Sequence, residues 1–571
     1  MRTRLSLAGA ALCAAAGFAF PGPQTATLGH RGAPAEIRSP AAVQESPAEQ
    51  EPASLEGAVL DAVTGAPVAK VRLALAAEDG NREHNRQTVT DSSGRFRFEN
   101  VRPGRYRLRA SKNRYVRFSY GERRPGGRGA ILTLRPGARL DDLVLKLTPA
   151  AVITGPVLDE DGEPVAYARV NVLRYRYVDG EKRLMAVNRG ASTNDLGEYR
   201  LFGLTPGRYY LSVTHGRPTV SFARSRTGRE TPAESQAYPT LYYPGVPDVS
   251  QAAPLKLEPG EERRGIDFRL TPAPAATISG QVRGAPGRVM VILRRQGEPL
   301  WVARGPGGVT DRRTGEFFIE GVLPGAYVLE AVTMREGEQL FARLPVFVGD
   351  DGLRGVVLEL RPGVKVSGRV VFDGEAPGGA LEKIRVSLLA PVNILFFGSR
   401  GGRVDSEGRF ALESIVPGRH RIRVYGLPDG AYLKAAVVEG ADVLEDGLEV
   451  PEAGLAGLQV TIGLRAALVT GTVLEEDGKP VAGATVVLAP ERRRRTDLFR
   501  SVTTDQYGRF FIEGIAPGEY QIFAFDDVES GAWSDPDFLA EWEDAATEIE
   551  LEEGGREAVE LELIVVSEGQ Q

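Results

Sequence analysis

Residues 91–106 read DSSGRFRFENVRPGRY, and closely similar blocks recur four more times along the chain. The other copies are residues 194–209 (NDLGEYRLFGLTPGRY), 314–327 (TGEFFIEGVLPGAY), 405–420 (DSEGRFALESIVPGRH) and 505–520 (DQYGRFFIEGIAPGEY). In every copy the first glycine and the glycine after the proline are ten residues apart, and successive blocks follow at intervals of roughly 100 residues. This period indicates about five tandem modules of one kind.

Each block has the composition of a turn, a strand, a second turn and a second strand. Asp-x-x-Gly suits a tight turn in which the aspartate caps backbone N–H groups, and Pro-Gly suits a type II turn. Phe96 and Phe98 alternate with arginines, as do Tyr106 and Leu108, and this period of two is typical of strands with one buried face. We expect a positive φ at the glycine after each proline: Gly104, Gly207, Gly325, Gly418 and Gly518.

A Gly-x-Val element precedes each block, beginning at Gly57, Gly155, Gly280, Gly368 and Gly471. In the second and fifth copies it continues into an Asp-Gly-x-Pro-Val turn, at residues 161–165 and 477–481. Short strands with turn signals at this spacing predict an all-β fold made of antiparallel Greek-key β-sandwiches. No segment after the N-terminal leader has a convincing helical period.

The order G-x-V, D-G-x-P-V-x-x-A, T-D-x-x-G-x-F and P-G-x-Y resembles the carboxypeptidase regulatory-like domain, a transthyretin-like (prealbumin-like) sandwich that is also grouped with carbohydrate-binding-like folds. The resemblance is strong in the first, second and fifth copies and looser in the third and fourth, which lack D-G-x-P-V. It implies a tandem array of about five such sandwiches. It implies no activity, because this fold accompanies peptidases, transporters and adhesins alike.

We predict a signal peptide at residues 1–20, a disordered leader rich in Pro, Ala and Glu at 21–53, and five β-sandwich modules at 54–148, 150–271, 275–361, 363–462 and 466–566. The joints between modules are a few residues long and contain proline, which stiffens them. We therefore expect an elongated array rather than a compact globule.

The N-terminus has the composition of an export signal, with a basic start followed by an apolar run over residues 5–20. Cleavage should leave a mature chain that begins near residue 20 to 27 and has no cysteine, because Cys13 is the only one. A cysteine-free chain suits an oxidising compartment and excludes disulfides and thiolate metal sites. We expect a periplasmic, secreted or cell-surface protein with no transmembrane segment in the mature chain.

Composition and motifs give no sign of catalysis. The net charge of −6 provides no field to attract nucleic acid. The four histidines, His30, His84, His215 and His420, lie far apart in the sequence, and no catalytic, cofactor-binding or metal-binding residue is predicted. The acidic stretches at 159–162 and 475–478 read as hairpin turns rather than calcium loops. The basic runs at 123–128 and 492–495 read as solvated loops, with polyanion binding as the alternative.

The candidate ligand-stacking residues are Tyr238, Tyr242 and Tyr243, in an insertion that makes the second module the longest. Exposed rings stack on sugars or on partner side chains, but residues 118–127 of the first module resemble this segment, which favours a packed structural role. Trp533 and Trp542 fit either a core or an exposed rim. We predict a non-catalytic protein that binds carbohydrate or an extracytoplasmic protein partner; the alternative is a passive spacer.

Overall fold

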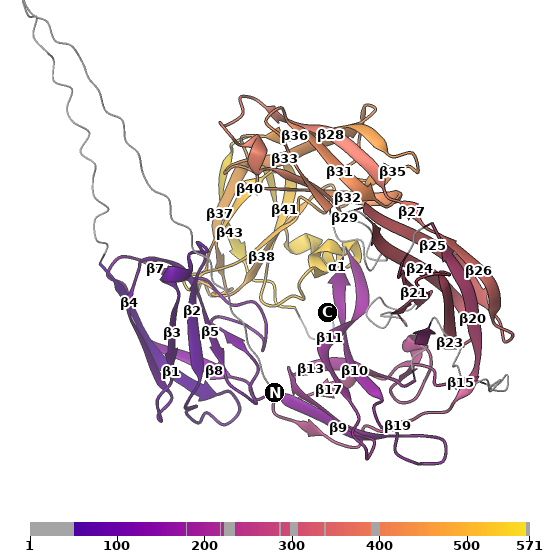
Figure 1. Cartoon of the computed structure of the whole chain (residues 1–571). Helices are drawn as coiled ribbons and strands as arrows, with labels where there is room; N and C mark the ends of the chain where they lie inside the picture. The colour runs from indigo at the N-terminus through magenta and orange to yellow at the C-terminus, as the bar shows by residue number, and fades with distance from the viewer. Residues whose placement is uncertain are drawn as a thin grey trace, which may run out of the picture. The chain divides into compact units, whose positions relative to one another are not determined.

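The structure of the protein is a computed structural model, and almost all of its regular elements are strands (Figure 1). It describes residues 51–178, 180–216, 219–221, 235–284, 287–296, 307–335, 338–389 and 400–566. The predicted signal peptide and residues 21–50 of the predicted leader lie outside this range. Within the range, no helix is long and apolar enough to cross a membrane.

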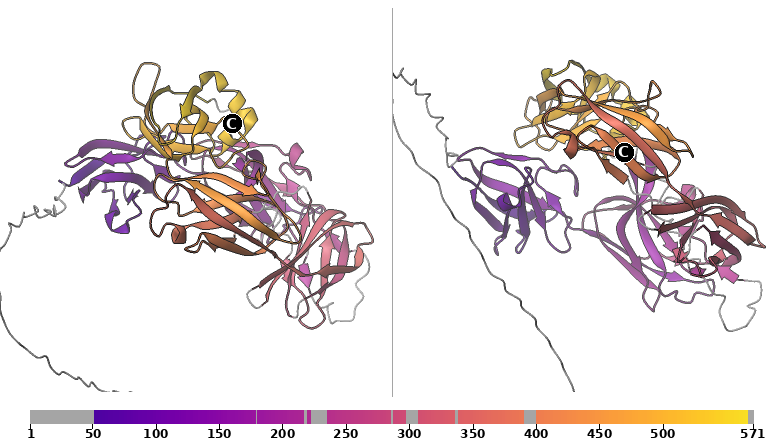
Figure 2. Two further views of the ribbon diagram at one scale, coloured as in Figure 1. Left: turned by 90° about the horizontal axis from the view of Figure 1, so that it is seen from above. Right: turned by 45° about the horizontal axis from the view of Figure 1, so that its top comes forward.

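The strands of the described residues form ten sheets, packed in pairs around five clusters of buried apolar side chains. Each cluster takes residues from one repeat block, such as Phe96 and Tyr106 in one and Phe510 and Tyr520 in another. We call each pair of sheets a module and number the modules along the chain. Two facing layers of strands are visible in the further views (Figure 2). The prediction of an all-β sandwich fold is confirmed.

The first module shows the common plan. One sheet has the Gly-x-Val strand β1 (Ala53–Asp61) between the antiparallel β4 (Arg95–Val101) and the parallel β8 (Arg139–Leu147). The facing sheet is β3 (Arg86–Val89), β2 (Arg72–Ala77), β5 (Gly104–Ser111), β6 (Phe118–Ser119) and β7 (Leu132–Leu134), with β6 and β7 both paired to β5. The Pro-Gly pair lies where the chain passes from β4 in one sheet to β5 in the other.

The second and fifth modules follow the same plan. The second has β12 (Glu198–Leu204), β9 (Ala151–Leu158), β18 (Glu262–Arg263) and β19 (Phe268–Arg269) facing β11 (Glu181–Ser192), β10 (Arg169–Val178), β13 (Gly207–Thr214), β16 (Leu241–Tyr242) and β17 (Leu255–Leu257). The fifth has β40 (Arg509–Ile515), β37 (Ala467–Leu474) and β43 (Arg556–Glu562) facing β39 (Arg500–Thr503), β38 (Thr485–Pro490), β41 (Gly518–Phe525) and β42 (Thr547–Leu551).

The third and fourth modules depart from the plan at their edges. The third has β23 (Glu316–Val322), β20 (Ala273–Arg283) and β26 (Leu353–Glu359) facing β22 (Gly307–Val309), β21 (Met290–Arg295), β24 (Gly325–Arg335), β25 (Glu338–Val348) and β27 (Arg361–Pro362). The fourth has β31 (Arg409–Ile415), β28 (Val364–Asp373), β36 (Leu455–Gly463), β33 (Tyr432–Val438) and β34 (Ala441–Asp442) facing β30 (Arg400–Arg403), β29 (Arg385–Leu389), β32 (Gly418–Tyr425) and β35 (Leu448–Val450).

Part of the insertion in the second module belongs to the sheet of the third. β14 (Thr219–Ser221) pairs with β23, and β15 (Ser235–Ala237) pairs with the start of β20, both antiparallel. Strand pairing requires backbone hydrogen bonds rather than particular side chains, so the repeat pattern carries no sign of this exchange. The predicted limits of 150–271 and 275–361 therefore separate segments that share one sheet.

Short helices cover one face of the fifth module. They are the 3₁₀ turns Ala532–Ser534 and Glu543–Ala545 and the helix α1 (Pro536–Ala540), drawn in yellow in Figures 1 and 2. Trp533, Phe538 and the half-buried Trp542 pack there against Phe525, in a second apolar cluster outside the sandwich core. Both tryptophans therefore pack in a core. Further 3₁₀ turns lie at Arg82–His84, Val249–Gln251 and Leu381–Lys383.

The Gly-x-Val glycine is required by a close approach of the chain. A Cβ on Gly57 would lie 2.0 Å from the carbonyl oxygen of Leu143 on the closing strand, far inside van der Waals contact. The corresponding distances from an added Cβ to the nearest carbonyl oxygen are 2.0, 2.3, 2.0 and 2.2 Å for Gly155, Gly280, Gly368 and Gly471. Only glycine lets the closing strand pack this tightly.

The Pro-Gly corner is fixed by a ring. Tyr106 lies two residues after Gly104, and its hydroxyl donates to the carbonyl oxygen of Arg102 at 2.9 Å. Tyr209, Tyr327 and Tyr520 repeat this bond at 2.9, 2.7 and 2.8 Å, and in the fourth module the Nε2 of His420 replaces the hydroxyl, 2.7 Å from the oxygen of Val416. The five glycines have φ between 122° and 155°, so the predicted positive φ is confirmed, but the corner is more extended than the predicted type II turn.

The Asp-x-x-Gly turn forms as predicted. The Oδ1 of Asp91 accepts the N–H groups of Ser93 and Arg95 at 2.9 and 2.8 Å. Asn194, Asp405 and Asp505 cap three other turns in the same way, and Asp311 caps the remaining turn by accepting the N–H groups of Arg313 and Thr314. In the third module the capping Asp311 lies one residue further from the glycine than the capping residue of the other copies does. The Asp-x-x-Gly motif therefore did not identify it in the sequence.

The first and fifth modules contact each other directly. The side-chain amide of Gln506 exchanges two hydrogen bonds with the backbone of Thr133, at 2.9 and 2.8 Å, and the Oγ1 of Thr503 donates to the carbonyl of Gly129 at 3.0 Å. These partners are more than 370 residues apart in the sequence. The expectation of an elongated array is therefore wrong for the described residues, because proline in a joint stiffens it but does not set its direction.

Candidate functional site

The three predicted stacking tyrosines pack into the second module. Tyr242, on β16, is 4% exposed and lies in a small cluster with Leu173 and Leu184 on the outer face of the sheet. Tyr238 and Tyr243 are half-buried against the main core, where the ring of Tyr243 lies edge-on to Phe268 at 6.2 Å and that of Tyr238 lies 5.4 Å from His215. This packing favours the structural role, and a ligand-stacking role stays a prediction.

The likeness of this segment to residues 118–127 is a real feature of the fold. β16 pairs with β13 in the second module as β6 pairs with β5 in the first. In both places the pairing extends the sheet that contains the Pro-Gly strand. None of the three tyrosines lines the pocket described next.

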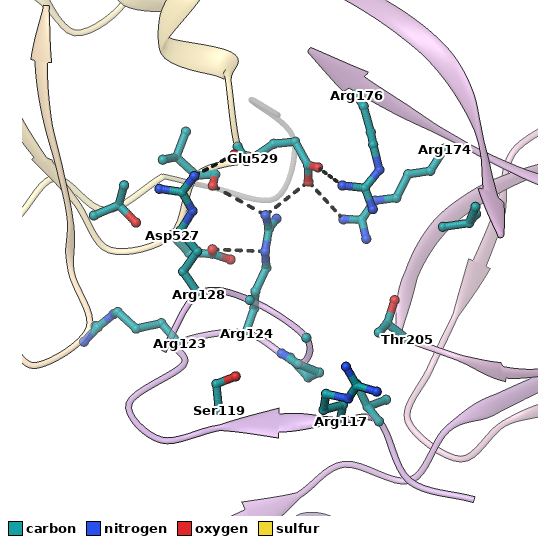
Figure 3. A pocket seen from close by; sticks show the side chains of 18 of the residues that line it. Arg117, Ser119, Arg123, Arg124, Arg128, Arg174, Arg176, Thr205, Asp527 and Glu529 are labelled. Carbon is teal, nitrogen blue, oxygen red and sulfur yellow. Dashed lines mark hydrogen bonds and ion pairs between the residues drawn. The ribbon is translucent and has the colours of Figure 1, made fainter. Parts of the chain in front are cut away.

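A pocket of about 500 Å³ lies where the first, second and fifth modules meet (Figure 3). The first module contributes the loop at 123–128, which follows β6, together with Arg117 and Ser119. The second contributes Arg174 and Arg176, two residues apart on β10 and therefore on the same face of that strand. The fifth contributes residues 526–530, the loop that follows β41.

The centre of the pocket is a carboxylate held by three guanidinium groups. Glu529 is only 9% exposed, and its Oε1 lies 3.1 Å from the Nη1 of Arg176. Its Oε2 lies 3.1 Å from the Nη2 of Arg124 and 3.6 Å from the Nη2 of Arg174. Arg124 also pairs through Nε with Asp527, at 3.0 Å. Figure 3 shows these side chains converging from three modules. A buried carboxylate needs such partners, because an unpaired charge would be strongly destabilising.

Arginines outnumber carboxylates along the pocket wall. Six arginines line it, at positions 117, 123, 124, 128, 174 and 176, against Asp526, Asp527 and Glu529. Arg128 donates to the hydroxyls of Ser501 and Ser530 at 3.0 Å each and lies over the ring of Trp533. Within the described residues, Arg117 and Arg123 have no hydrogen bond or ion pair. The pocket therefore has an excess of positive charge.

Two carboxyl groups near the pocket titrate close to neutral pH. Burial raises the pKa of Asp527 to about 6, although Arg124 works in the opposite direction. Burial also raises the pKa of Glu122 to about 7, against the effect of the N–H groups of Ser119 and Gly126, which donate to it. Because both groups lose charge as the pH falls, the positive excess of the pocket grows below neutral pH.

The remaining candidates from the sequence have structural roles. In the basic run at 492–495, Arg495 pairs with Asp497 at 2.9 Å and Arg494 pairs with Asp446. The acidic stretch at 159–162 is a turn capped by Asp159, as predicted. In the part of the chain that the structure describes, no three His, Cys, Asp or Glu side chains are grouped as metal ligands would be.

The basic run at 123–128, predicted as a solvated loop with polyanion binding as the alternative, lies in the pocket. Its partners were not identified from the sequence. Arg174 and Arg176 alternate with tyrosines in a strand, and Glu529 stands among several acidic residues more than 350 residues away. The only available signal was the arginine run itself.

Three segments of the chain match the family model of the carboxypeptidase regulatory-like domain: residues 54–139, 152–229 and 468–563. These are the three modules in which the sequence resemblance is strong, so that resemblance is confirmed for them. No curated protein is similar enough in sequence to count as a relative.

Several solved structures are similar to parts of the chain. The streptococcal ancillary pilin is 11% identical with a TM-score of 0.18, covering 50% of this chain and 98% of its own. GBS52, a minor pilin of Streptococcus agalactiae, is 14% identical with a TM-score of 0.21, covering 41% of this chain and 99% of its own. BcpA, the major pilin subunit of Bacillus cereus, is 11% identical with a TM-score of 0.14, covering 54% of this chain and 99% of its own. Likeness at this level supports no inference about function.

Proposed function

We propose that this chain is a non-catalytic, exported binding protein whose ligand is anionic and occupies the pocket between the first, second and fifth modules. The observation that carries the proposal is the pocket wall, where six arginines face three carboxylates and Arg117 and Arg123 are unpaired within the described residues. Guanidinium groups bind carboxylate, sulfate and phosphate groups with two parallel hydrogen bonds, which makes arginine the usual residue for such ligands.

The ligand classes that fit are an acidic glycan or an acidic segment of an extracytoplasmic protein. A volume of about 500 Å³ is within the range of small-ligand pockets. The non-catalytic part of the proposal rests on the sequence, which contains no nucleophile motif, and on Asp527 and Glu529 of the pocket, which are engaged in ion pairs with arginine.

The proposed export is testable separately. The basic and apolar N-terminal pattern predicts cleavage, so the secreted material should begin near residue 20 to 27. N-terminal sequencing of the exported protein checks this, and a chain that retains Met1 would contradict it.

The binding test compares anionic and neutral ligands. We expect sulfated, phosphorylated or carboxylated oligosaccharides to bind the mature protein, in a salt-dependent manner, while their neutral counterparts do not. The double variant Arg117→Ser/Arg123→Ser should weaken that binding by about tenfold or more, corresponding to about 1.4 kcal/mol or more. Arg312→Ser/Arg313→Ser is the matched control, because it removes the same charge from an exposed turn of the third module.

Calorimetric titration of the three proteins decides the outcome. Equal binding of neutral sugars, or unchanged affinity in the double variant, would show that the pocket is not the site. Absence of binding to every probe would favour the passive spacer, which needs no ligand.

The tyrosine segment stays a second candidate surface. Tyr238→Ala should weaken ligand binding by about 1–3 kcal/mol, with little change in melting temperature, if the ring stacks on a ligand. Tyr242→Ala should instead cost about 3 kcal/mol of folding stability, because that ring is buried. A titration and a thermal melt on both variants separate the two roles, and loss of stability without loss of affinity in Tyr238→Ala would end the stacking hypothesis.

A further inference from the structure

Glu529 is placed as a ligand carboxylate would be. Both of its oxygens are bound by guanidinium groups, from Arg124 in the first module and from Arg174 and Arg176 in the second. The carboxylate itself comes from the loop at 526–530, which joins β41 to the short helices rather than forming part of a sandwich sheet. The binding groups are thus on two modules, and the group they bind is on a loop of a third.

The three guanidinium groups already bind a carboxylate in this structure. A planar carboxylate offers two oxygens, and here each accepts from a different arginine, with Arg124 also reaching Asp527. Around this centre the wall offers hydroxyl groups from Ser119 and Thr205, on the two modules that supply the arginines. Hydroxyl groups and guanidinium donors together suit a sugar that has both hydroxyls and a carboxylate.

Exchange of Glu529 for a ligand carboxylate is energetically reasonable. The attraction within a buried ion pair is largely offset by the loss of hydration, and a strong cost arises only when one partner is left unpaired. A ligand that restores the same ion pairs leaves no arginine uncompensated. It can also contact Arg117 and Arg123, which Glu529 does not reach, and this favours the ligand over the loop.

We propose that the ligand is a saccharide that bears a carboxylate, of the uronic acid type, and that its carboxylate displaces Glu529 from Arg124, Arg174 and Arg176. This rests on the proposed function, because it names the ligand class of the same pocket. Displacement frees the 526–530 loop, which also accepts a hydrogen bond from Arg124 at the carbonyl of Val528. Ligand binding therefore loosens the contact of the fifth module with the first two.

The first measurement uses Glu529→Gln, which keeps the shape and removes the charge of the internal competitor. We expect this variant to bind an oligogalacturonate about tenfold or more tightly than the wild type, by calorimetric titration. Glu262→Gln is the matched control. Glu262 pairs with Arg200 and Arg264 on the surface of the second module, outside the pocket. The Glu262→Gln variant should therefore bind the oligogalacturonate as tightly as the wild type does.

The second measurement does not depend on the Glu529 variant folding. The mature chain has no cysteine, so Val89→Cys in the first module and Glu548→Cys in the fifth, both exposed, accept a pair of fluorophores. We expect oligogalacturonate to change the energy transfer between them and the uncharged galactose oligomer to leave it unchanged.

Each outcome decides one part. Unchanged or weaker binding by Glu529→Gln, or a ligand-independent transfer signal, would overturn the displacement. Binding of a sulfated or phosphorylated oligosaccharide, or of an oligoglutamate peptide, in place of the oligogalacturonate would overturn the ligand class while the proposed function stands. Failure of every anionic probe to bind would overturn the proposed function itself.

Discussion

The second and fifth modules have the same turn after their first strand, yet only one of the two turns docks on another module. Residue 167 in Pro-Val-Ala-Tyr-Ala and residue 483 in Pro-Val-Ala-Gly-Ala occupy the same place, and both have a left-handed backbone, with φ of 60° and 76°. Tyr167 is 81% exposed, whereas a Cβ on Gly483 would lie 1.9 Å from the carbonyl oxygen of Gly121 in the first module. A missing side chain is what lets the first module approach.

The neighbouring turn repeats the difference. In the fifth module Gln506 binds the backbone of Thr133, and its amide matches a strand edge because it both donates and accepts. The second module has Asp195 at this place, followed by the exposed Leu196. The same repeat template therefore forms a docking turn in the fifth module and an exposed turn in the second, and Gly483 and Gln506 are two of the positions that differ.

The largest expected effect comes from exchanging the two residues. Gly483→Tyr should separate the first and fifth modules, because the new side chain must displace backbone, and it should lower the free energy of unfolding by about 3 kcal/mol or more. Energy transfer between labels at positions 89 and 548, together with a thermal melt, measures both effects. The reverse change, Tyr167→Gly, is the control and should alter stability by about 0.5 kcal/mol or less, because that ring is exposed. Unchanged energy transfer in Gly483→Tyr would mean that the contact does not depend on the glycine.

Features that depend on nearby residues were predictable, and features that depend on distant ones were not. The capped turns and the positive φ of the Pro-Gly glycines follow from short motifs, because the atoms involved are within four residues of one another. The site joins Arg124, Arg174 and Glu529, and no short motif connects them. A packed role for Tyr242 was favoured by the sequence, but its partners were not predicted, because Leu173 and Leu184 cover it from the outer face of the sheet.

The arginine run at 123–128 shows how a partial signal was discounted. A charge run is more often a solvated loop, and the sequence alone does not reveal that this loop faces two other modules. Similarly, the run Val486-Val487-Leu488-Ala489 on β38 is apolar without alternation, which is typical of a strand buried on both faces. That pattern was the available sign that Trp533 and its neighbours cover the fifth module.

A second prediction concerns the corner glycines, where two glycines of the fourth module both have free space around them but differ in conformation. An added Cβ meets nothing within 4 Å at either Gly418 or Gly378, but only Gly418 has a positive φ, of 122°. Gly418→Ala should therefore lower the free energy of unfolding by about 1 kcal/mol or more through backbone strain alone. Gly378→Ala should leave it within about 0.5 kcal/mol of the wild type, or raise it slightly. Denaturant unfolding of the two variants compares them, and an equal effect would mean that conformation is not what selects glycine at the corner.

The smallest effect distinguishes the corner of the fourth module from the other four, because it alone contains a titratable imidazole. The Nε2 of His420 donates to Val416, its Nδ1 is buried without a partner, and burial lowers the pKa of the ring. Since the folded state then binds a proton less readily than the unfolded state, stability is full above about pH 6.5 and is lost as the pH falls below it, by at most about 1.4 kcal/mol per pH unit.

His420→Tyr introduces the hydroxyl of the other corners, and the free space beside Gly418 lies where their tyrosine rings approach the glycine in the first, third and fifth modules. The unfolding free energies of variant and wild type are measured on the mature chain at pH 7.5 and 5.5. The variant should gain stability relative to the wild type at the lower pH. A difference that is the same at both values would mean that His420 remains unprotonated in the unfolded chain or is protonated without cost in the folded one.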